Sequence, residues 1–270
     1  ANTRFVLGSM IYICTARDYA GVMMIDTARF QFPFVIAHRG APLLAPENAL
    51  PALEAAIHSG AKYIETDIQL AATGEACLFH DDRLKRTTNG KGVFEKQPWS
   101  LLQQLDVGEW FDSQYRGVRV PLLSQWLQCA AAHSVGLNLE IKPTKQVEAV
   151  VDATLAMIDK HWRDDLPPLL ISSKSQIILG QFAEQRPSLA RAWVCPKWRY
   201  RCVHVLEQLA CVSIHCDHRV LSAKRVKAVR SAGFQVLAFT VNDSDRADQL
   251  FDWGVSAIFS DNMDLVAQYD

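Results

Sequence analysis

Residues 63–80 of the chain read YIETDIQLAATGEACLFH, and this stretch decides the fold. It contains two strand-like segments, Tyr63–Leu70 and Ala76–His80, separated only by a short connection that includes Thr73 and Gly74. Parallel neighbours in a sheet need a crossover of a dozen or more residues, so these two segments must form an antiparallel hairpin. The first segment can belong to a parallel sheet, and the second returns beside it.

Strand-like segments and amphipathic helical patterns alternate along the rest of the chain. Further strands are predicted at Phe34–Ala37, Leu137–Ile141, Leu169–Ser172, Arg191–Cys195, Val212–His215, Gln235–Val241 and Ala257–Ser260. Helices are predicted at Asn48–Ser59, Leu123–His133, Gln146–His161, Ser175–Gln185, Tyr200–Gln208, Ala223–Ala232 and Asp245–Trp253. This alternation is typical of a parallel sheet with crossover helices. Without the returning hairpin strand, eight parallel strands remain, so the predicted fold is an α/β (β/α)8 TIM barrel with an antiparallel hairpin after strand 2.

Length and composition fit one barrel domain. The chain has 270 residues, 49% of them hydrophobic, and a formal net charge of -1. Because a nucleic-acid-binding protein usually carries a basic excess, no nucleic-acid partner is predicted. We predict an N-terminal extension outside the catalytic core at residues 1–30 and the barrel domain at residues 31–270. Residues 83–121 lack clear periodicity and are predicted to be a small cap over the barrel mouth, with a plain surface insertion as the alternative.

The cysteines and the N-terminal segment indicate the cellular compartment of the protein. Seven cysteines at irregular spacings are typical of free thiols in a reducing compartment, which predicts the cytoplasm, with the periplasm as the alternative. The apolar run from Phe5 to Cys14 is too short to span a bilayer, so no stable membrane insertion is predicted. A signal peptide remains open as a second interpretation of this run, and the oligomeric state is left open.

The hairpin brings an acid and a histidine together at one end of the barrel. If Thr73 and Gly74 form a two-residue loop, Asp67 lies opposite His80, with β-carbons roughly 5 Å apart. Side chains alternate along a strand with a period of two, so Glu65 lies on the same face as Asp67. Enzymes with this barrel carry their sites at the carboxyl ends of the strands, which makes this cluster a candidate site.

Carboxylates on buried strands need a positive partner. Glu65 and Asp67 lie in one apolar strand and Glu140 in another, where an unpaired carboxylate is costly. Three carboxylates without a thiol suit one hard divalent cation, Mg²⁺ or Ca²⁺. Salt bridges to Arg39 and Lys142 are the structural alternative.

Histidines and cations complete the predicted site. His38 and His80 are expected to flank a phosphate as base and acid, because imidazoles exchange protons near neutral pH. Arg39 offers forked donors that match a phosphate, and Lys142 shares a face with Glu140. His215, near the end of the seventh barrel strand, is either a pocket residue or peripheral. The histidines in helical segments are predicted to lie at the surface: His58, His133, His161 and His204.

Several motifs together resemble the bacterial glycerophosphodiester phosphodiesterases of the short cytosolic type. They are HRGAPLLAPENAL at residues 38–50, ETDIQL at 65–70, CLFHDD at 77–82, LEIKP at 139–143, FTVN at 239–242 and FSDN at 259–262. Residues 86–111 look like the short insertion of that family. The chain departs from the family pattern at Phe239, where a tryptophan is usual, which keeps an apolar wall but removes an indole donor.

The resemblance implies a role for each matched residue. His38 and His80 would be the catalytic pair, and Glu65, Asp67 and Glu140 would bind the Mg²⁺ or Ca²⁺ ion. The substrate would contact Arg39, Lys142 and Phe239, and Glu47 would help to organise the site.

The implied reaction is hydrolysis of a glycerophosphodiester to sn-glycerol 3-phosphate and an alcohol, through a cyclic phosphate. A tethered glycerol hydroxyl is a sensible nucleophile, because its effective molarity can reach on the order of 10⁵ M. Two alternatives remain: a lysophospholipase D-type hydrolase acting on lysophospholipids, and an inactive barrel that serves as a binding module. A long apolar groove in residues 83–121 would favour the first.

Overall fold

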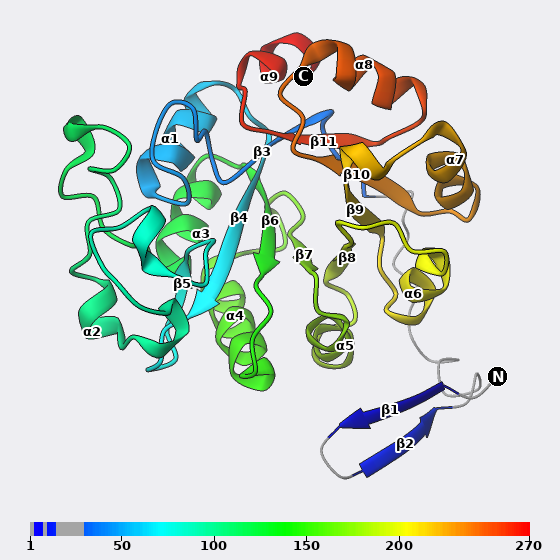
Figure 1. The fold of residues 1–270 in the computed structure, drawn as a ribbon, viewed down its shortest axis with the longest axis horizontal. Coiled ribbons are helices and arrows are strands. Elements are labelled where there is room, and N and C mark those ends of the chain that lie inside the picture. The colour runs from blue at the N-terminus through cyan, green and yellow to red at the C-terminus, as the bar shows by residue number, and fades with distance from the viewer. Residues whose placement is uncertain (1–2, 8–9, 15–29) are drawn as a thin grey trace.

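A computed structural model describes residues 3–7, 10–14 and 30–270 of the chain, and the strands of residues 30–270 form a single sheet. Its order is β3-β11-β10-β9-β8-β7-β6-β4-β5, and an additional pairing between β3 and β4 closes eight strands into a ring (Figure 1). The predicted (β/α)8 barrel is therefore confirmed. The strands are β3 Val35–Ala37, β4 Tyr63–Leu70, β5 Ala76–Leu78, β6 Gly136–Ile141, β7 Leu170–Ser173, β8 Ala190–Val194, β9 Ser213–Asp217, β10 Gln235–Phe239 and β11 Ala257–Ser260.

Helices pack around the outside of the ring because each buries one apolar face against the strands. They are α1 Leu50–His58, α3 Leu123–Ala132, α4 Val147–His161, α5 Gln176–Gln185, α6 Cys202–Gln208, α7 Ala223–Ser231, α8 Ser244–Asp252 and α9 Asp264–Tyr269. The sequence predicted all of these except α9, to within two residues at each end. Among the described helices, none combines the length and the hydropathy that crossing a bilayer requires.

The hairpin forms as predicted, but its register is shifted by one residue. Ile68 pairs with Leu78, and the Phe79 amide donates to the Asp67 carbonyl at 3.0 Å, so Phe79 rather than His80 lies opposite Asp67. The prediction of a two-residue loop was wrong. The Ala71 amide donates to the Glu75 carbonyl at 2.9 Å and closes a loop of three residues.

His80 nevertheless lies beyond the end of β5 and is not bound by the alternation of that strand. The side-chain amide of Gln69 donates to the carbonyl oxygens of Phe79 and Asp81, both at 2.9 Å. These two bonds fix the backbone on either side of His80. The hydrogen bonds from Gln69 therefore position His80 near Asp67, which the predicted cross-strand pairing was expected to do.

Residues 83–121 form a compact insertion beside the barrel mouth. It contains the helical turns η1 Leu84–Arg86, η2 Phe94–Lys96 and η3 Ser113–Tyr115 and the helix α2 Trp99–Leu102. Its own core includes Phe94, whose ring stacks on Phe79 with centroids 4.7 Å apart. Figure 1 shows it next to β5 and α1. None of the described residues 83–121 lines the central cavity, and the role of the insertion as a cap stays a prediction.

The N-terminal prediction falls mostly outside the described residues. Strands β1 Thr3–Leu7 and β2 Met10–Cys14 pair antiparallel, while residues 1–2, 8–9 and 15–29 are not described. The extension at residues 1–30 and the open signal-peptide interpretation therefore stay predictions. Phe30, assigned to the extension, is only 6% exposed, and its ring lies 4.7 Å from that of Phe32.

The interior of the ring is filled with apolar side chains. Ile36, Leu170, Leu237 and Phe259 belong to one buried cluster that Phe30 also joins. This packing closes the barrel below the strand ends. The site built on those ends therefore opens at the carboxyl-terminal mouth.

Candidate active site

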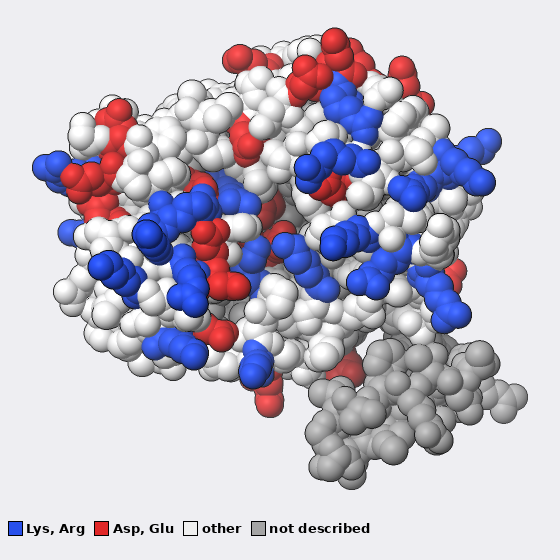
Figure 2. All heavy atoms as spheres, in the orientation of Figure 1, with Lys and Arg blue, Asp and Glu red and all other residues white. Residues whose placement is uncertain are grey.

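A cavity of about 120 Å³ opens at the carboxyl ends of the barrel strands. Seven of the predicted site residues line it: His38, Arg39, Glu65, Asp67, His80, Glu140 and Phe239. Figure 2 shows this face of the molecule, with a hollow that has acidic side chains in its depth and Lys and Arg side chains around it.

The three predicted acids converge on one point. Glu65, Asp67 and Glu140 each offer a carboxylate oxygen, and these oxygens lie within 4.8 Å of one another. Glu65 and Asp67 come from β4, and Glu140 comes from the neighbouring β6, where it pairs in register with Asp67. Burial, followed by the charges of Asp67 and Glu140, raises the pKa of Glu65 well above its usual range. This oxygen-rich donor set therefore fits a divalent cation, whose charge would relieve that repulsion.

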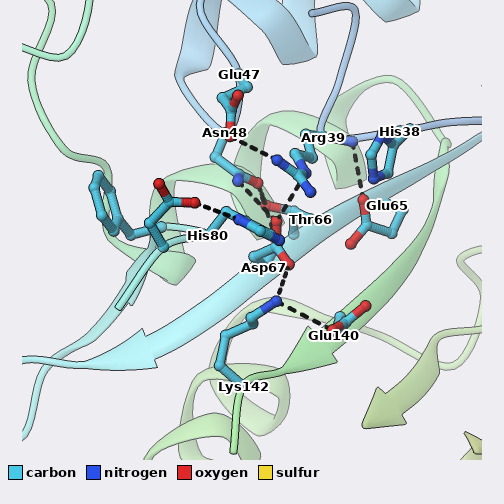
Figure 3. Close-up of polar contacts among 12 residues, drawn as sticks. His38, Arg39, Glu47, Asn48, Glu65, Thr66, Asp67, His80, Glu140 and Lys142 are labelled. Atoms are coloured by element: carbon cyan, nitrogen blue, oxygen red, sulfur yellow. Dashed lines mark hydrogen bonds and ion pairs between the residues drawn. The ribbon is translucent and has the colours of Figure 1, made fainter. Parts of the chain in front are cut away.

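Lys142 lies between two of these acids. Its Nζ atom donates to Asp67 Oδ1 at 3.0 Å and to Glu140 Oε1 at 3.2 Å (Figure 3). Burial lowers the pKa of Lys142, but the charges of Asp67 and Glu140 outweigh it and raise the pKa above its usual value. Burial likewise disfavours the charged form of Asp67, yet Lys142 and Arg39 hold its pKa well below the usual range. The salt-bridge alternative thus accounts for Asp67 but leaves Glu65 without a cationic side chain of its own.

Arg39 is held in an uncommon backbone conformation with a φ of 54°. Its amide donates to Glu65 Oε2 at 2.9 Å, its Nη1 donates to Glu47 Oε1 at 2.8 Å, and its Nε lies 3.3 Å from Asp67 Oδ2. Gly40 follows with a φ of 84°, and a β-carbon there would lie 2.6 Å from the Ala52 carbonyl carbon. Only glycine fits this approach, which explains the turn that brings Arg39 over the acids.

Asn48 is a site residue that the sequence did not identify, because it was predicted only as the first residue of the helix Asn48–Ser59. The N-cap of α1 is Ala49, and Asn48 is buried with a φ of 56°. Its Nδ2 donates to Asp67 Oδ2 at 3.0 Å, and its Oδ1 accepts from Thr66 Oγ1 at 2.8 Å and from the Asp67 amide at 3.1 Å. Asn48 therefore fixes the orientation of the Asp67 carboxylate (Figure 3).

His38 has a carboxylate partner that the sequence did not identify. Its Nδ1 lies 2.7 Å from Asp261 Oδ1, and Asn242 Nδ2 donates to Asp261 Oδ2 at 2.9 Å. Burial raises the pKa of Asp261, but the hydrogen bonds to His38 and Asn242 and the charges of His38 and Arg39 together outweigh burial, so the pKa is lowered. Asn242 and Asp261 lie in the FTVN and FSDN motifs, which were the only sequence signal for them.

His80 has a partner of the same kind, and that partner is anchored in turn. Its Nδ1 lies 2.6 Å from Asp81 Oδ1, and Arg86 Nε donates to Asp81 Oδ2 at 2.6 Å. Arg86 also donates to Glu47 at 2.7 and 2.8 Å, so Glu47 joins this group to Arg39. Burial, with the charges of Lys142 and Arg39, lowers the pKa of His80. In Figure 3 the acids lie between His80 on one side and His38 on the other.

His215, which the sequence left open, lines the cavity. It is 1% exposed, and burial lowers its pKa to about 3, so its ring is neutral at physiological pH. Its Nε2 lies 3.2 Å from Ser213 Oγ. Lys174, not predicted, also lines the cavity, with its Nζ 4.0 Å from Glu140 Oε1.

The assembled site can carry out acid–base chemistry next to a cation. Each of the two histidines presents one ring nitrogen to a carboxylate, which fixes the ring and leaves the other nitrogen for proton transfer. Oxygen ligands between them suit a hard cation that stabilises developing negative charge.

Known proteins share this fold and part of this sequence. The chain is 28% identical over 246 residues to a glycerophosphodiester phosphodiesterase of Bacillus subtilis (strain 168), covering 85% of this chain and 84% of that protein. A phosphodiesterase of Oleispira antarctica, solved in complex with the product sn-glycerol-3-phosphate, matches with a TM-score of 0.85 and 36% identity, covering 88% of this chain and 96% of that one. A glycerophosphodiester phosphodiesterase of Agrobacterium tumefaciens str. C58 matches with a TM-score of 0.72 and 26% identity, covering 88% and 100%.

The family match covers seven of the eight barrel strands, from β4 to β11, and begins directly after β3. The sequence model of the Glycerophosphoryl diester phosphodiesterase family matches residues 38–265, which run from His38 at the end of β3 into α9. The matched stretch includes the two histidines His38 and His80 and the three clustered acids. It also includes the positively charged side chains of Arg39 and Lys142. The chain therefore belongs to the Glycerophosphoryl diester phosphodiesterase family.

Proposed function

We propose that this chain is a metal-dependent hydrolase that cleaves glycerophosphodiesters to sn-glycerol 3-phosphate and the free alcohol. The observation that carries the proposal is the cluster of Glu65, Asp67 and Glu140, with carboxylate oxygens within 4.8 Å, in a cavity that two carboxylate-bound histidines also line. The product named for the Oleispira antarctica relative, sn-glycerol-3-phosphate, supports the same reaction.

We assign Glu65, Asp67 and Glu140 as the ligands of one Mg²⁺ or Ca²⁺ ion. The raised pKa of buried Glu65 supports this assignment, because a cation would favour its ionised form. When bound, the ion supplies Lewis-acid stabilisation of the negative charge on the phosphoryl oxygens. Lys142 and Arg39 add fixed positive charge at the same edge, although both are already paired with acids.

The two histidines divide the proton transfers. One imidazole removes the proton from the glycerol hydroxyl next to the phosphoester, and the oxygen attacks phosphorus. The other imidazole donates a proton to the departing alcohol oxygen, so a cyclic phosphate and a free alcohol result. Water then opens the ring, with the histidine roles reversed, and leaves sn-glycerol 3-phosphate. Asp261 and Asp81 hold the two rings in place throughout.

The alternatives receive less support. Phe94 of the insertion is 0% exposed, and the groove that the described insertion helps to form is lined mostly by charged and polar residues. This polarity favours water-soluble diesters over the lysophospholipids of a lysophospholipase D-type enzyme. An inactive binding module would not need two histidines that are each oriented by a carboxylate.

We propose the cytoplasm as the location, with Mg²⁺ available there in excess. The cysteines of residues 30–270 support it, because they are free thiols: Cys77, Cys129, Cys195, Cys202, Cys211 and Cys216. A small glycerophosphodiester is the proposed partner.

The test is release of sn-glycerol 3-phosphate from a panel of glycerophosphodiesters. Activity should disappear after EDTA treatment and return with Mg²⁺ or Ca²⁺, and His38→Ala and His80→Ala should each lower kcat by about 10²-fold or more. Release that continues in EDTA would overturn the metal assignment. No release from any diester would overturn the function.

A further inference from the structure

A groove of about 460 Å³ lies beside the active-site cavity, between the insertion and the loop that follows β6. One wall is made by Asp82 and Arg83, after the hairpin, together with Val93 and Glu95 of the insertion. The opposite wall is made by Thr144 and Lys145. The Thr144 hydroxyl donates to Glu95 Oε2 at 3.1 Å, so a hydrogen bond joins the two walls.

Three residues that line the groove closely follow active-site residues in the chain. Gln69 lies two positions beyond Asp67 on β4, and Asp82 lies two positions beyond His80. Pro143, also in the lining, directly follows Lys142. Three segments that carry active-site residues therefore continue into the groove.

The catalytic cavity measures about 120 Å³, below the roughly 300–1,000 Å³ of sites that enclose a drug-sized ligand. It is also smaller than the groove of about 460 Å³. In the proposed reaction, the attacking hydroxyl belongs to the glycerol, so the glycerol and the phosphate must occupy the cavity. The alcohol then lies outside it, next to whichever histidine protonates the departing oxygen.

Four of the eight residues that line the groove are charged. Two carboxylates, Asp82 and Glu95, and two cations, Arg83 and Lys145, contribute to the lining. Glu95 and Lys145 come from the opposite walls, so a bound group can meet both signs of charge.

We propose that this groove binds the alcohol portion of the substrate, and that it selects small alcohols that carry a charged group. The inference rests on the proposed function. It also assigns His80 as the histidine that protonates the departing alcohol, since the chain runs from His80 directly into the groove wall. Glu95 interacts with an ammonium group on the alcohol, and Lys145 interacts with a carboxylate.

The test compares three diesters that differ only in the alcohol: glycerophosphomethanol, glycerophosphoethanolamine and glycerophosphoserine. Each kcat/KM is expressed relative to that of the methanol diester, which does not reach the groove. We expect Glu95→Gln to lower the ratio for the ethanolamine diester about tenfold, and Lys145→Met to lower the ratio for the serine diester about tenfold. Val93→Trp, which fills the groove, should lower both ratios.

Matched controls lie at exposed positions of α5 and α4, where Glu184→Gln and Lys160→Met remove the same charges outside the groove lining. Both controls should keep wild-type ratios. Ratios that stay unchanged in Glu95→Gln, Lys145→Met and Val93→Trp would overturn the groove assignment, provided all three diesters release sn-glycerol 3-phosphate. If no diester releases it, the proposed function fails instead, so the two failures are distinguishable.

Discussion

The Nδ1 atom of His38 lies 2.7 Å from the Oδ1 atom of Asp261, although 223 positions separate the two residues in the sequence. Closure of the barrel makes this contact, because β11 pairs with β3 and the two residues follow the ends of these neighbouring strands. Asn242, after β10, holds the other oxygen of Asp261 at 2.9 Å. Three strands therefore determine how one imidazole is oriented.

Asp261→Asn should lower kcat by on the order of 10²-fold with little change in KM, because the neutral amide neither stabilises a protonated imidazole nor enforces its tautomer. Steady-state kinetics on a glycerophosphodiester measure both parameters. Asp264→Asn, at an exposed position three residues on, is the control and should behave as wild type. A wild-type kcat in Asp261→Asn would show that the carboxylate does not position His38.

Strand positions and the acidic cluster could be predicted from the sequence because both depend on local pattern. Each strand is a short apolar run, and Glu65, Asp67 and Glu140 stood out as carboxylates within such runs. Residues of parallel strands at one end of a barrel converge whatever the loops do. The loop between β4 and β5 was different, since one extra residue in the turn shifted the register.

Asn48 and Asp261 could not be predicted, because their roles depend on distant contacts. Asn48 follows Pro46 and Glu47 and precedes a helix, which by local rules indicates an N-cap. Its left-handed backbone instead directs the side chain to Thr66 and Asp67, 18 and 19 residues away. Hydrogen bonds of this range leave no periodic trace in the sequence.

Asn48→Ala should destabilise the fold by about 2–3 kcal/mol, because it leaves the buried Thr66 hydroxyl, the Asp67 amide and one Asp67 oxygen without their partner. Urea unfolding followed by circular dichroism measures the change in the free energy of unfolding. Exposed Gln103→Ala is the control and should change it by less than about 0.5 kcal/mol. An equally small change in Asn48→Ala would contradict the positioning of Asp67 by Asn48.

Glu65→Gln should raise the Tm of the metal-free protein. Burial and the charges of Asp67 and Glu140 raise the pKa of Glu65, so the folded state holds a proton that the unfolded state releases above about pH 4.3. The stability of the metal-free wild type therefore falls as the pH rises above that value. The difference in Tm between Glu65→Gln and the wild type should grow with pH. Differential scanning fluorimetry in EDTA at several pH values measures it.

Addition of Mg²⁺ or Ca²⁺ should make the Tm of the wild type higher than that of Glu65→Gln, because ligand binding to the folded state raises the Tm of the wild type. Glu65→Gln, which lacks one proposed ligand, should gain less. A metal-free Glu65→Gln protein with a lower Tm than wild type at pH 8 would rule out the repulsion among the three acids.

Arg86→Ala should lower the Tm at pH 7 more than at pH 2. The hydrogen bond from Arg86, which outweighs burial, lowers the pKa of Asp81 to about 2. The unfolded value is about 3.9, so this stabilisation is complete above pH 4 and is lost as the pH falls to 2. Thermal melts across this range test it, with Arg163→Ala, whose pair with Asp165 is exposed, as the control. A Tm deficit that does not change with pH would exclude the Asp81 pair as its source.

Anomalous diffraction from crystals of the protein soaked in Mn²⁺ tests the assembled site most directly, because Mn²⁺ takes the oxygen ligands of Mg²⁺ and scatters anomalously. We expect one strong peak at about 2.0–2.6 Å from oxygens of Glu65, Asp67 and Glu140. That peak should be lost in Glu140→Gln crystals treated in the same way. A fully soaked wild-type crystal without a peak there, or with its strongest peak elsewhere, would contradict the account.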